Sequence, residues 1–249
     1  MKINSDFYEG FHKNTKPQQK IISKKNFTYK RIIEILDKFL LPKGTILDIG
    51  CGAGTIDFYL AKNNHKVTGI DISQKSISAC NQTNEILRLK SAPVFKVIDF
   101  PNHKLSGEYD SIICLEVIEH VAEDKKALKI IFELLNSDGI LILSTPSKNA
   151  PLHKIGYSKN FDTRVGHLRR YSSEELDHLL ENSGFIVLKT IKLEGVVRNF
   201  LFLNKFAGKL IRILNKIEFF STIVTFLDDL SLFLFGESDL LVVARKKTK

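Results

Sequence analysis

Short apolar runs alternate with amphipathic stretches along most of the chain. The runs predict strands that begin near residue 46 and then span 66–70, 94–98, 109–114, 139–144, 185–191 and 240–244. Helical spacing between them predicts helices over 26–40, from residue 55, over 73–89, over 124–135 and from residue 173. Strands that alternate with helices predict an α/β fold with a doubly wound parallel sheet, whose ligands bind at the carboxyl ends of the strands.

The length of 249 residues suits one elaborated α/β domain, so residues 1–249 are expected to form a single domain. The three cysteines, Cys51, Cys80 and Cys114, are odd in number and far apart. This spacing excludes a disulfide framework and a zinc motif and favours a reducing cytoplasm. The first ten residues lack the apolar core of a signal peptide, and no run reaches the roughly 18 apolar residues of a membrane span.

The net charge is +9, and much of it lies near the two ends of the chain. Lysines are dense in a basic N-terminal extension, residues 1–25, and again at 245–249. A solubilising surface is the first interpretation of this charge, and contact with an anionic membrane or with nucleic acid are the alternatives. The chain has no RNA-binding module and no basic stripe interleaved with aromatics, which disfavours nucleic acid as a partner.

The first predicted strand leads into Ile-Leu-Asp-Ile-Gly-Cys-Gly-Ala-Gly at residues 46–54. This segment contains Asp48, Cys51 and three alternate glycines, Gly50, Gly52 and Gly54. Such a turn lets the backbone approach a ligand that a Cβ atom would repel. The second strand ends at Asp71, and an acid at that place binds the hydroxyls of a ribose. Together the loop and the acid predict a site for an adenosine-type cofactor.

The loop differs from a dinucleotide fingerprint, because Thr55 stands where the third glycine is required and no Lys or Arg is present to meet a phosphate. Asp48 would repel a phosphate but could help hold an ammonium group. The segment resembles motif I of the class I S-adenosylmethionine-dependent methyltransferases. That resemblance implies a Rossmann-like seven-stranded sheet with an antiparallel last strand. It also implies further cofactor contacts from Arg31, Ile72, Asp99, Phe100 and Leu115.

Three polar residues, Glu116, Glu119 and His120, follow the fourth strand. If the chain coils there, the i, i+3, i+4 spacing gathers them on one side. Two carboxylates and an imidazole suit Mg²⁺ or another divalent metal, and without a metal His120 is a general base, with Glu116 beside it. The pattern resembles the Glu-x-x-Glu-His of the ubiquinone-biosynthesis O-methyltransferases, a methyltransferase type 11 group, and of small-RNA 2′-O-methyltransferases. This resemblance implies a further histidine ligand, for which His167 is the candidate.

Between the last two strands lies a hydrophobic helical insert, residues 195–236, with eight of the 18 phenylalanines. Apolar residues follow helical spacing up to Ile217, and a second apolar stretch ends at Asp228 and Asp229. A cap on the core is the first interpretation. Peripheral contact with a membrane or a lipid acceptor, which would bring a cytoplasmic protein to the inner face of the membrane, and a homodimer interface are the alternatives.

The sequence therefore predicts an S-adenosylmethionine-dependent methyltransferase. The expected reaction is O-methylation of a hydroxyl on a small molecule such as a quinol precursor, a lipid or a glycan, with or without a divalent metal. Two other functions stay open. One is an RNA 2′-O-methyltransferase, and the other is a non-catalytic protein that binds the cofactor or acts as a scaffold at a membrane.

Overall fold

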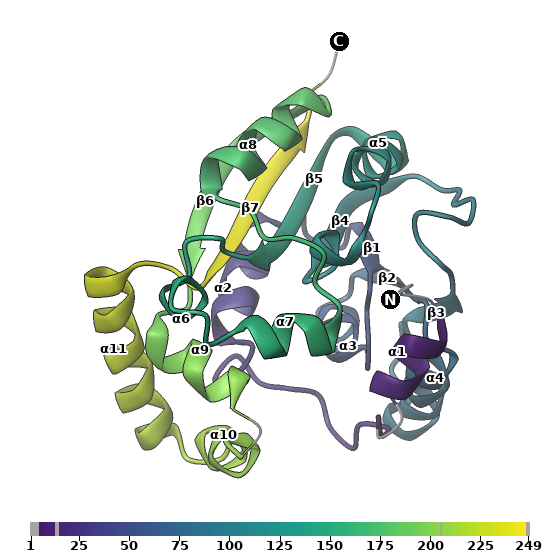
Figure 1. Cartoon of the computed structure of the whole chain (residues 1–249). Helices are drawn as coiled ribbons and strands as arrows, with labels where there is room; N and C mark the ends of the chain where they lie inside the picture. The colour runs from purple at the N-terminus through teal and green to yellow at the C-terminus, as the bar shows by residue number, and fades with distance from the viewer. Residues whose placement is uncertain (1–4, 13–14, 205, 248–249) are drawn as a thin grey trace.

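The computed structural model describes residues 5–12, 15–204 and 206–247, and within them seven strands form one sheet (Figure 1). The strand order is β3-β2-β1-β4-β5-β7-β6. The strands are β1 (Thr45–Ile49), β2 (Lys66–Asp71), β3 (Val94–Val97), β4 (Tyr109–Leu115), β5 (Leu135–Pro146), β6 (Phe185–Leu193) and β7 (Asp239–Lys246). Strands β1 to β5 pair in parallel, whereas β7 runs antiparallel to β5 and to β6. The predicted doubly wound sheet with an antiparallel last strand is confirmed.

Helices cover both faces of this sheet. Those N-terminal to residue 183 are α1 (Ser5–Phe11), α2 (Lys30–Phe39), α3 (Thr55–Lys62), α4 (Gln74–Leu87), the 3₁₀ helix η1 (Ile118–His120), α5 (Asp124–Leu134), α6 (Pro151–Lys154), α7 (Lys159–Val165) and α8 (Ser173–Asn182). On one face α5 and α8 contribute Leu128 and Leu176 to a buried cluster. On the other face α2 and α3 contribute Leu36 and Leu60 to a second cluster. Helices α2, α5 and α8 each bury an apolar stripe, whereas α3 is buried at every position from Ile56 to Ala61.

The strand order places the candidate site. The switch point lies between β1 and β4, because β2 and β3 are added on one side of β1 and β4 and β5 on the other. In parallel sheets a ligand crevice forms at such a switch point, outside the carboxyl ends of the strands. The glycine loop after β1 and the polar residues after β4 therefore emerge side by side at one edge of the sheet.

Several elements differ from the sequence prediction. Helix α2 begins at Lys30 rather than four residues earlier, and α6 and α7 occupy a segment for which no helix was predicted. The insert folds as three helices, α9 (Val196–Leu203), α10 (Gly208–Leu214) and α11 (Glu218–Phe235). Of the basic extension 1–25, residues 1–4 and 13–14 lie outside the described residues, and α1 lies within it.

Local hydrogen bonds explain how the insert divides. The Asn204 side chain accepts a hydrogen bond from the backbone N–H of Phe206 at 2.9 Å, a local bond that competes with continuation of a helix. Helix α11 continues through Asp228 and Asp229 because both carboxylates have cationic partners. Among the helices of the described residues, none combines the length and the apolar character that crossing a membrane requires.

Candidate active site

A cavity of about 1150 Å³ opens at the carboxyl edge of the sheet. It is lined by most of the residues predicted to contact a cofactor, namely Gly50, Gly52, Asp71, Ile72, Asp99, Phe100 and Leu115. Glu116, His120 and His167 line the same cavity. The structure therefore brings together two groups of residues, one expected to bind a cofactor and one expected to carry chemistry.

The glycine loop is fixed against the end of β2. The backbone N–H groups of Gly50 and Cys51 donate to the Ile70 carbonyl at 2.8 and 3.0 Å. Gly50 has φ of 77°, and a Cβ atom there would lie 2.3 Å from Cγ2 of Val117. Only glycine suits both the backbone angle and this close approach between the loops that follow β1 and β4.

Asp71 joins the loop to the second strand. One carboxylate oxygen, Oδ2, accepts from the Gly52 N–H at 2.9 Å, and the other, Oδ1, accepts from the Ser73 N–H at 2.8 Å. Each carboxylate oxygen can accept a second hydrogen bond, and the residue faces the cavity. Asp71 is therefore held in place by two backbone N–H groups, with further acceptor capacity at the cavity wall.

Three residues of the 46–54 segment that were predicted to contact a cofactor do not line the cavity. Asp48 is buried beneath the loop, where burial and the neighbouring Asp57 carboxylate raise its pKa well above the ordinary range. Cys51 points toward Cys80, whose hydrogen bond raises the pKa of the Cys51 thiol. Gly54 caps the amino end of α3 with φ of 71°. Asp48 is therefore not among the cavity-lining residues, where it was expected to help hold an ammonium group.

Arg31 does not line the cavity. Its guanidinium forms an ion pair with Asp229 of α11, and both side chains are partly exposed. The structure therefore does not bring Arg31 to the place where a cofactor carboxylate was expected. The reason is that α2 turns this side chain toward the insert, a part of the chain 198 residues away.

Glu116 stands apart from the other two polar residues that follow β4. It adopts φ of 56°, and Oε1 accepts from the Ser144 hydroxyl at 2.6 Å. The helix that follows, η1, is a single 3₁₀ turn of three residues. The helical spacing that would gather Glu116 with Glu119 and His120 is therefore not realised. Among the described residues, the acidic and histidine side chains placed to hold a metal are Glu119, His120 and His167.

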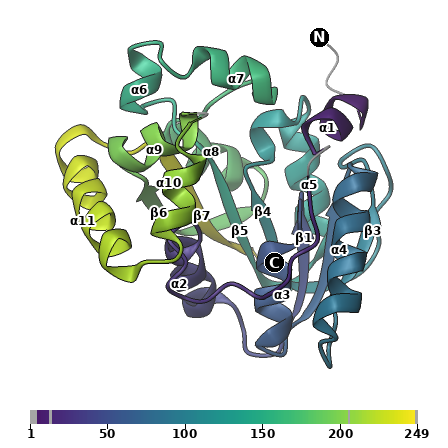
Figure 2. The same ribbon diagram turned by 90° about the horizontal axis from the view of Figure 1, so that it is seen from below.

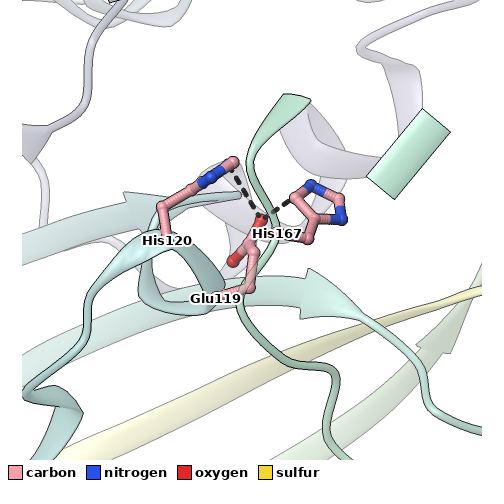
Figure 3. A group of neighbouring side chains, drawn as sticks. All are labelled: Glu119, His120 and His167. Atoms are coloured by element: carbon pink, nitrogen blue, oxygen red, sulfur yellow. Dashed lines mark ion pairs between the residues drawn. The ribbon is translucent and has the colours of Figure 1, made fainter. Parts of the chain in front are cut away.

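These three side chains converge on one point (Figure 3). Oε1 of Glu119 lies 3.8 Å from Nε2 of His120 and 3.8 Å from Nε2 of His167. The Glu119 side chain is fully buried, and its other oxygen accepts from the Thr145 hydroxyl at 3.1 Å. Oε1 itself has no hydrogen-bond partner.

The two imidazoles are oriented by their Nδ1 atoms. Nδ1 of His120 lies 3.0 Å from the Gly166 carbonyl, which can only accept, so this nitrogen carries a proton. Nδ1 of His167 lies 3.0 Å from the Asp162 carboxylate. Although burial opposes it, hydrogen bonds from His167 and Arg170 lower the pKa of Asp162, which keeps it an ionised acceptor. Nε2 of each ring therefore lies on the side of Glu119.

Burial sets the protonation of this group. It lowers the pKa of His120 to about 4, with the neighbouring His167 as a second cause, so this imidazole is neutral near pH 7. Burial and Glu116 raise the pKa of Glu119 well above its ordinary range. Oε1 of Glu119 and Nε2 of the neutral His120 are both acceptors, so they require a proton or a cation between them.

Some residues on the cavity wall were not identified from the sequence. Tyr8 of α1 packs its ring edge against His120, with centroids 5.8 Å apart. Glu194 and Asp239 also line the cavity, and burial raises the pKa of Glu194 to about 8. A signal for the two acids was available. Glu194 directly follows β6 and Asp239 begins β7. Because the two strands are antiparallel, the end of β6 and the start of β7 lie at the same edge of the sheet. The sequence holds no comparable signal for Tyr8.

Comparison with known proteins adds curated relatives of two kinds. The chain is 29% identical over 154 residues to a magnesium-protoporphyrin O-methyltransferase of Synechocystis, a match that covers 60% of this chain and 66% of the relative. It is 32% identical over 110 residues to a ubiquinone biosynthesis O-methyltransferase of Psychrobacter cryohalolentis, which covers 42% of this chain and 41% of the relative. The matched segments thus span less than two thirds of these relatives.

Solved structures share the fold. The magnesium protoporphyrin IX methyltransferase of Synechocystis with bound S-adenosylhomocysteine aligns with a TM-score of 0.60 at 20% identity, over 97% of this chain and 94% of that one. A [4+2]-cyclase aligns with a TM-score of 0.61 at 19% identity, over 88% and 81% of the two chains. At this level of identity the likeness concerns architecture alone.

A family model described as a methyltransferase domain matches residues 24–190. The matched segment contains the glycine loop, Asp71, Glu119, His120 and His167. It covers well over half of the chain, and the chain therefore belongs to the methyltransferase domain family.

Proposed function

We propose that this protein transfers the methyl group of S-adenosylmethionine to a hydroxyl oxygen of a small, largely apolar molecule. One observation carries the proposal: a single cavity holds Asp71 and the glycine loop at one part of its wall and neutral His120 at another. The curated relatives named above are O-methyltransferases, which supports oxygen as the acceptor atom. Apolar side chains such as Val121, Phe161 and Phe202 on the same wall suit an apolar acceptor.

The cofactor would lie along the edge of the sheet. Asp71 accepts the ribose hydroxyls, and Asp99 together with the backbone near Phe100 meets the adenine. Gly50 and Gly52 let the amino-acid part approach the loop closely. An acceptor bound beside the cofactor would then meet His120, which lines the same cavity. The chain would contribute to an in-line displacement mainly by holding the acceptor oxygen about 3 Å from the sulfonium methyl.

Glu119, His120 and His167 fit a divalent cation. The Nε2 atoms of two imidazoles and a buried carboxylate oxygen without a hydrogen-bond partner form the donor set that such ions take in proteins. The Nδ1 contacts to Gly166 and Asp162 are the outer contacts that orient histidine ligands. When bound, the cation would lower the pKa of an acceptor hydroxyl. Without it, Nε2 of His120 is the atom that accepts the hydroxyl proton.

Removal of His167 is expected to separate these roles. We expect His167→Ala to abolish binding of Mn²⁺ or Zn²⁺ in calorimetric titration and to lower kcat about 100-fold, because the ion loses one of three protein ligands. His178→Ala is the matched control, because His178 is exposed on α8 and away from the cavity. Turnover that is insensitive to chelator and to His167→Ala would contradict the cation and leave His120 acting alone.

The acceptor can be identified with radiolabelled S-adenosylmethionine. The protein is incubated with an extract of the source cells, which is then separated into organic, small aqueous and RNA fractions. We expect label in the organic fraction. Label in the RNA fraction alone would overturn the proposal in favour of an RNA 2′-O-methyltransferase. Cofactor binding by titration without label in any fraction would favour a non-catalytic role.

A further inference from the structure

The insert presents a surface rich in phenylalanine to solvent. Helices α10 and α11 and the segment before them expose Phe206 (90%), Phe233 (85%), Phe219 (69%), Phe226 (67%) and Phe235 (65%). On α11 the spacing of Phe219, Phe226 and Phe233 repeats every seven residues, which places them along one face of the helix. Contiguous exposed apolar surface of this kind marks a contact with a partner.

The aspartates of α11 are paired with arginines, whereas basic residues on and after α10 are exposed. Asp228 of α11 pairs with the buried Arg198, and Asp229 pairs with Arg31. Neither aspartate therefore presents an unpaired negative charge beside the phenylalanines. Lys209, Arg212 and Lys216, by contrast, are exposed on α10 and just after it. Exposed positive charge on α10 and just after it thus accompanies the apolar side chains of the insert.

This combination favours an anionic lipid bilayer over a second copy of the chain as the partner. A two-fold contact brings the same surface of each copy together, so the basic residues of both copies would lie within one interface. A helix that lies in a membrane interface instead inserts Phe and Leu among the acyl chains and directs Lys and Arg to lipid phosphates. We propose that the α10–α11 surface docks on the face of an anionic bilayer.

The same insert reaches the cavity. Helix α9 presents Asn199, Phe202 and Leu203 to the cavity wall. Figure 2 shows α9, α10 and α11 grouped at one end of the molecule, with α4 at the other. A bilayer on the α10–α11 surface would therefore lie close to the part of the cavity expected to receive the acceptor. Under the proposed function, the acceptor class is a lipid-soluble molecule with a hydroxyl group that enters from the bilayer past α9.

Flotation with vesicles tests the docking. The full chain is mixed with vesicles of phosphatidylcholine alone or with phosphatidylglycerol added, in low and high salt. We expect flotation with the anionic vesicles and at least about tenfold weaker binding in high salt or for Lys209→Glu with Arg212→Glu. Phe226→Ser with Phe233→Ser should weaken binding about 100-fold, because two phenylalanines no longer enter the acyl region.

Ile86→Ser is the matched control, because Ile86 is 44% exposed on α4, at the far end of the molecule from α11. Its binding should equal that of the unmodified protein. Absence of flotation, or flotation unchanged by the double phenylalanine variant, would overturn the proposal. So would a dimer in sedimentation analysis that the same variant dissociates. Flotation requires no turnover, so failure of the proposed reaction would leave this result unaffected, and cofactor titration of the double variant verifies that its cavity is intact.

Discussion

Asp71→Ala is expected to weaken binding of S-adenosylmethionine about 100-fold. The carboxylate is the group proposed to accept both ribose hydroxyls, and hydrogen bonds to a charged group contribute about 1.5 to 3 kcal/mol each. A loss of about 3 kcal/mol corresponds to roughly 100-fold in Kd. The carboxylate also accepts from the Gly52 N–H at 2.9 Å, so its removal loosens the loop that meets the rest of the cofactor. Isothermal titration with S-adenosylhomocysteine measures the change.

Two further variants show which role of Asp71 matters. Asp71→Asn keeps an oxygen that can accept from one backbone N–H but removes the charge, so its Kd should lie between those of the unmodified protein and Asp71→Ala. Asp99→Ala should raise the Kd about tenfold, because it removes one proposed hydrogen bond to the adenine. Equal affinities for Asp71→Ala and the unmodified protein, with unchanged thermal unfolding, would refute the assignment of this residue to the ribose.

The cofactor side of the site could be predicted from sequence because its signals are local. Gly50, Gly52 and Asp71 lie at or just after the end of a strand, and an apolar run in the sequence predicts each of these strands. The sheet order then brings the strand ends together without further information. The fold and this wall of the cavity therefore follow from patterns within short windows of sequence.

Other residues depended on contacts that no local pattern encodes. Glu116 carries the expected spacing to Glu119, yet the chain forms only one 3₁₀ turn there, and the positive φ of Glu116 sends its side chain to Ser144. Arg31 stands at a plausible distance before the glycine loop, but an aspartate 198 residues away pairs with it. Tyr8 reaches His120 from a helix in a segment notable only for its charge. In each case tertiary packing decided where the side chain points.

The insert was predicted as helical. A buried arginine, which the sequence did not single out, holds it against the rest of the fold. Arg198 of α9 is only 2% exposed. Its Nη1 donates to the Phe27 carbonyl at 2.6 Å, and its guanidinium carbon lies 4.1 Å from the centre of the Phe27 ring. Asp228 of α11 lies 3.6 Å from Nε and also accepts from the backbone N–H groups of Gly195 and Arg198. One side chain thus connects α9, α11 and the segment before α2.

Arg198→Ala is therefore expected to lower the free energy of unfolding by about 3 to 5 kcal/mol, since it leaves a buried carboxylate without its cation. For a chain of this size the midpoint of thermal unfolding should fall by roughly 10 °C, measured by calorimetry. Arg212→Ala is the matched control. Arg212 is exposed on α10, so its removal should change stability by less than about 0.5 kcal/mol.

A double variant separates the buried charge from the packing of the arginine. Arg198→Met with Asp228→Asn removes both charges, keeps most of the side-chain volume and leaves an amide oxygen that can accept from one of the backbone N–H groups. It should recover more than half of the stability lost in Arg198→Ala, because an apolar side chain of similar size often replaces a buried ion pair without loss. A double variant no more stable than Arg198→Ala would show instead that the contacts to Phe27 hold the insert in place, with the carboxylate contributing little.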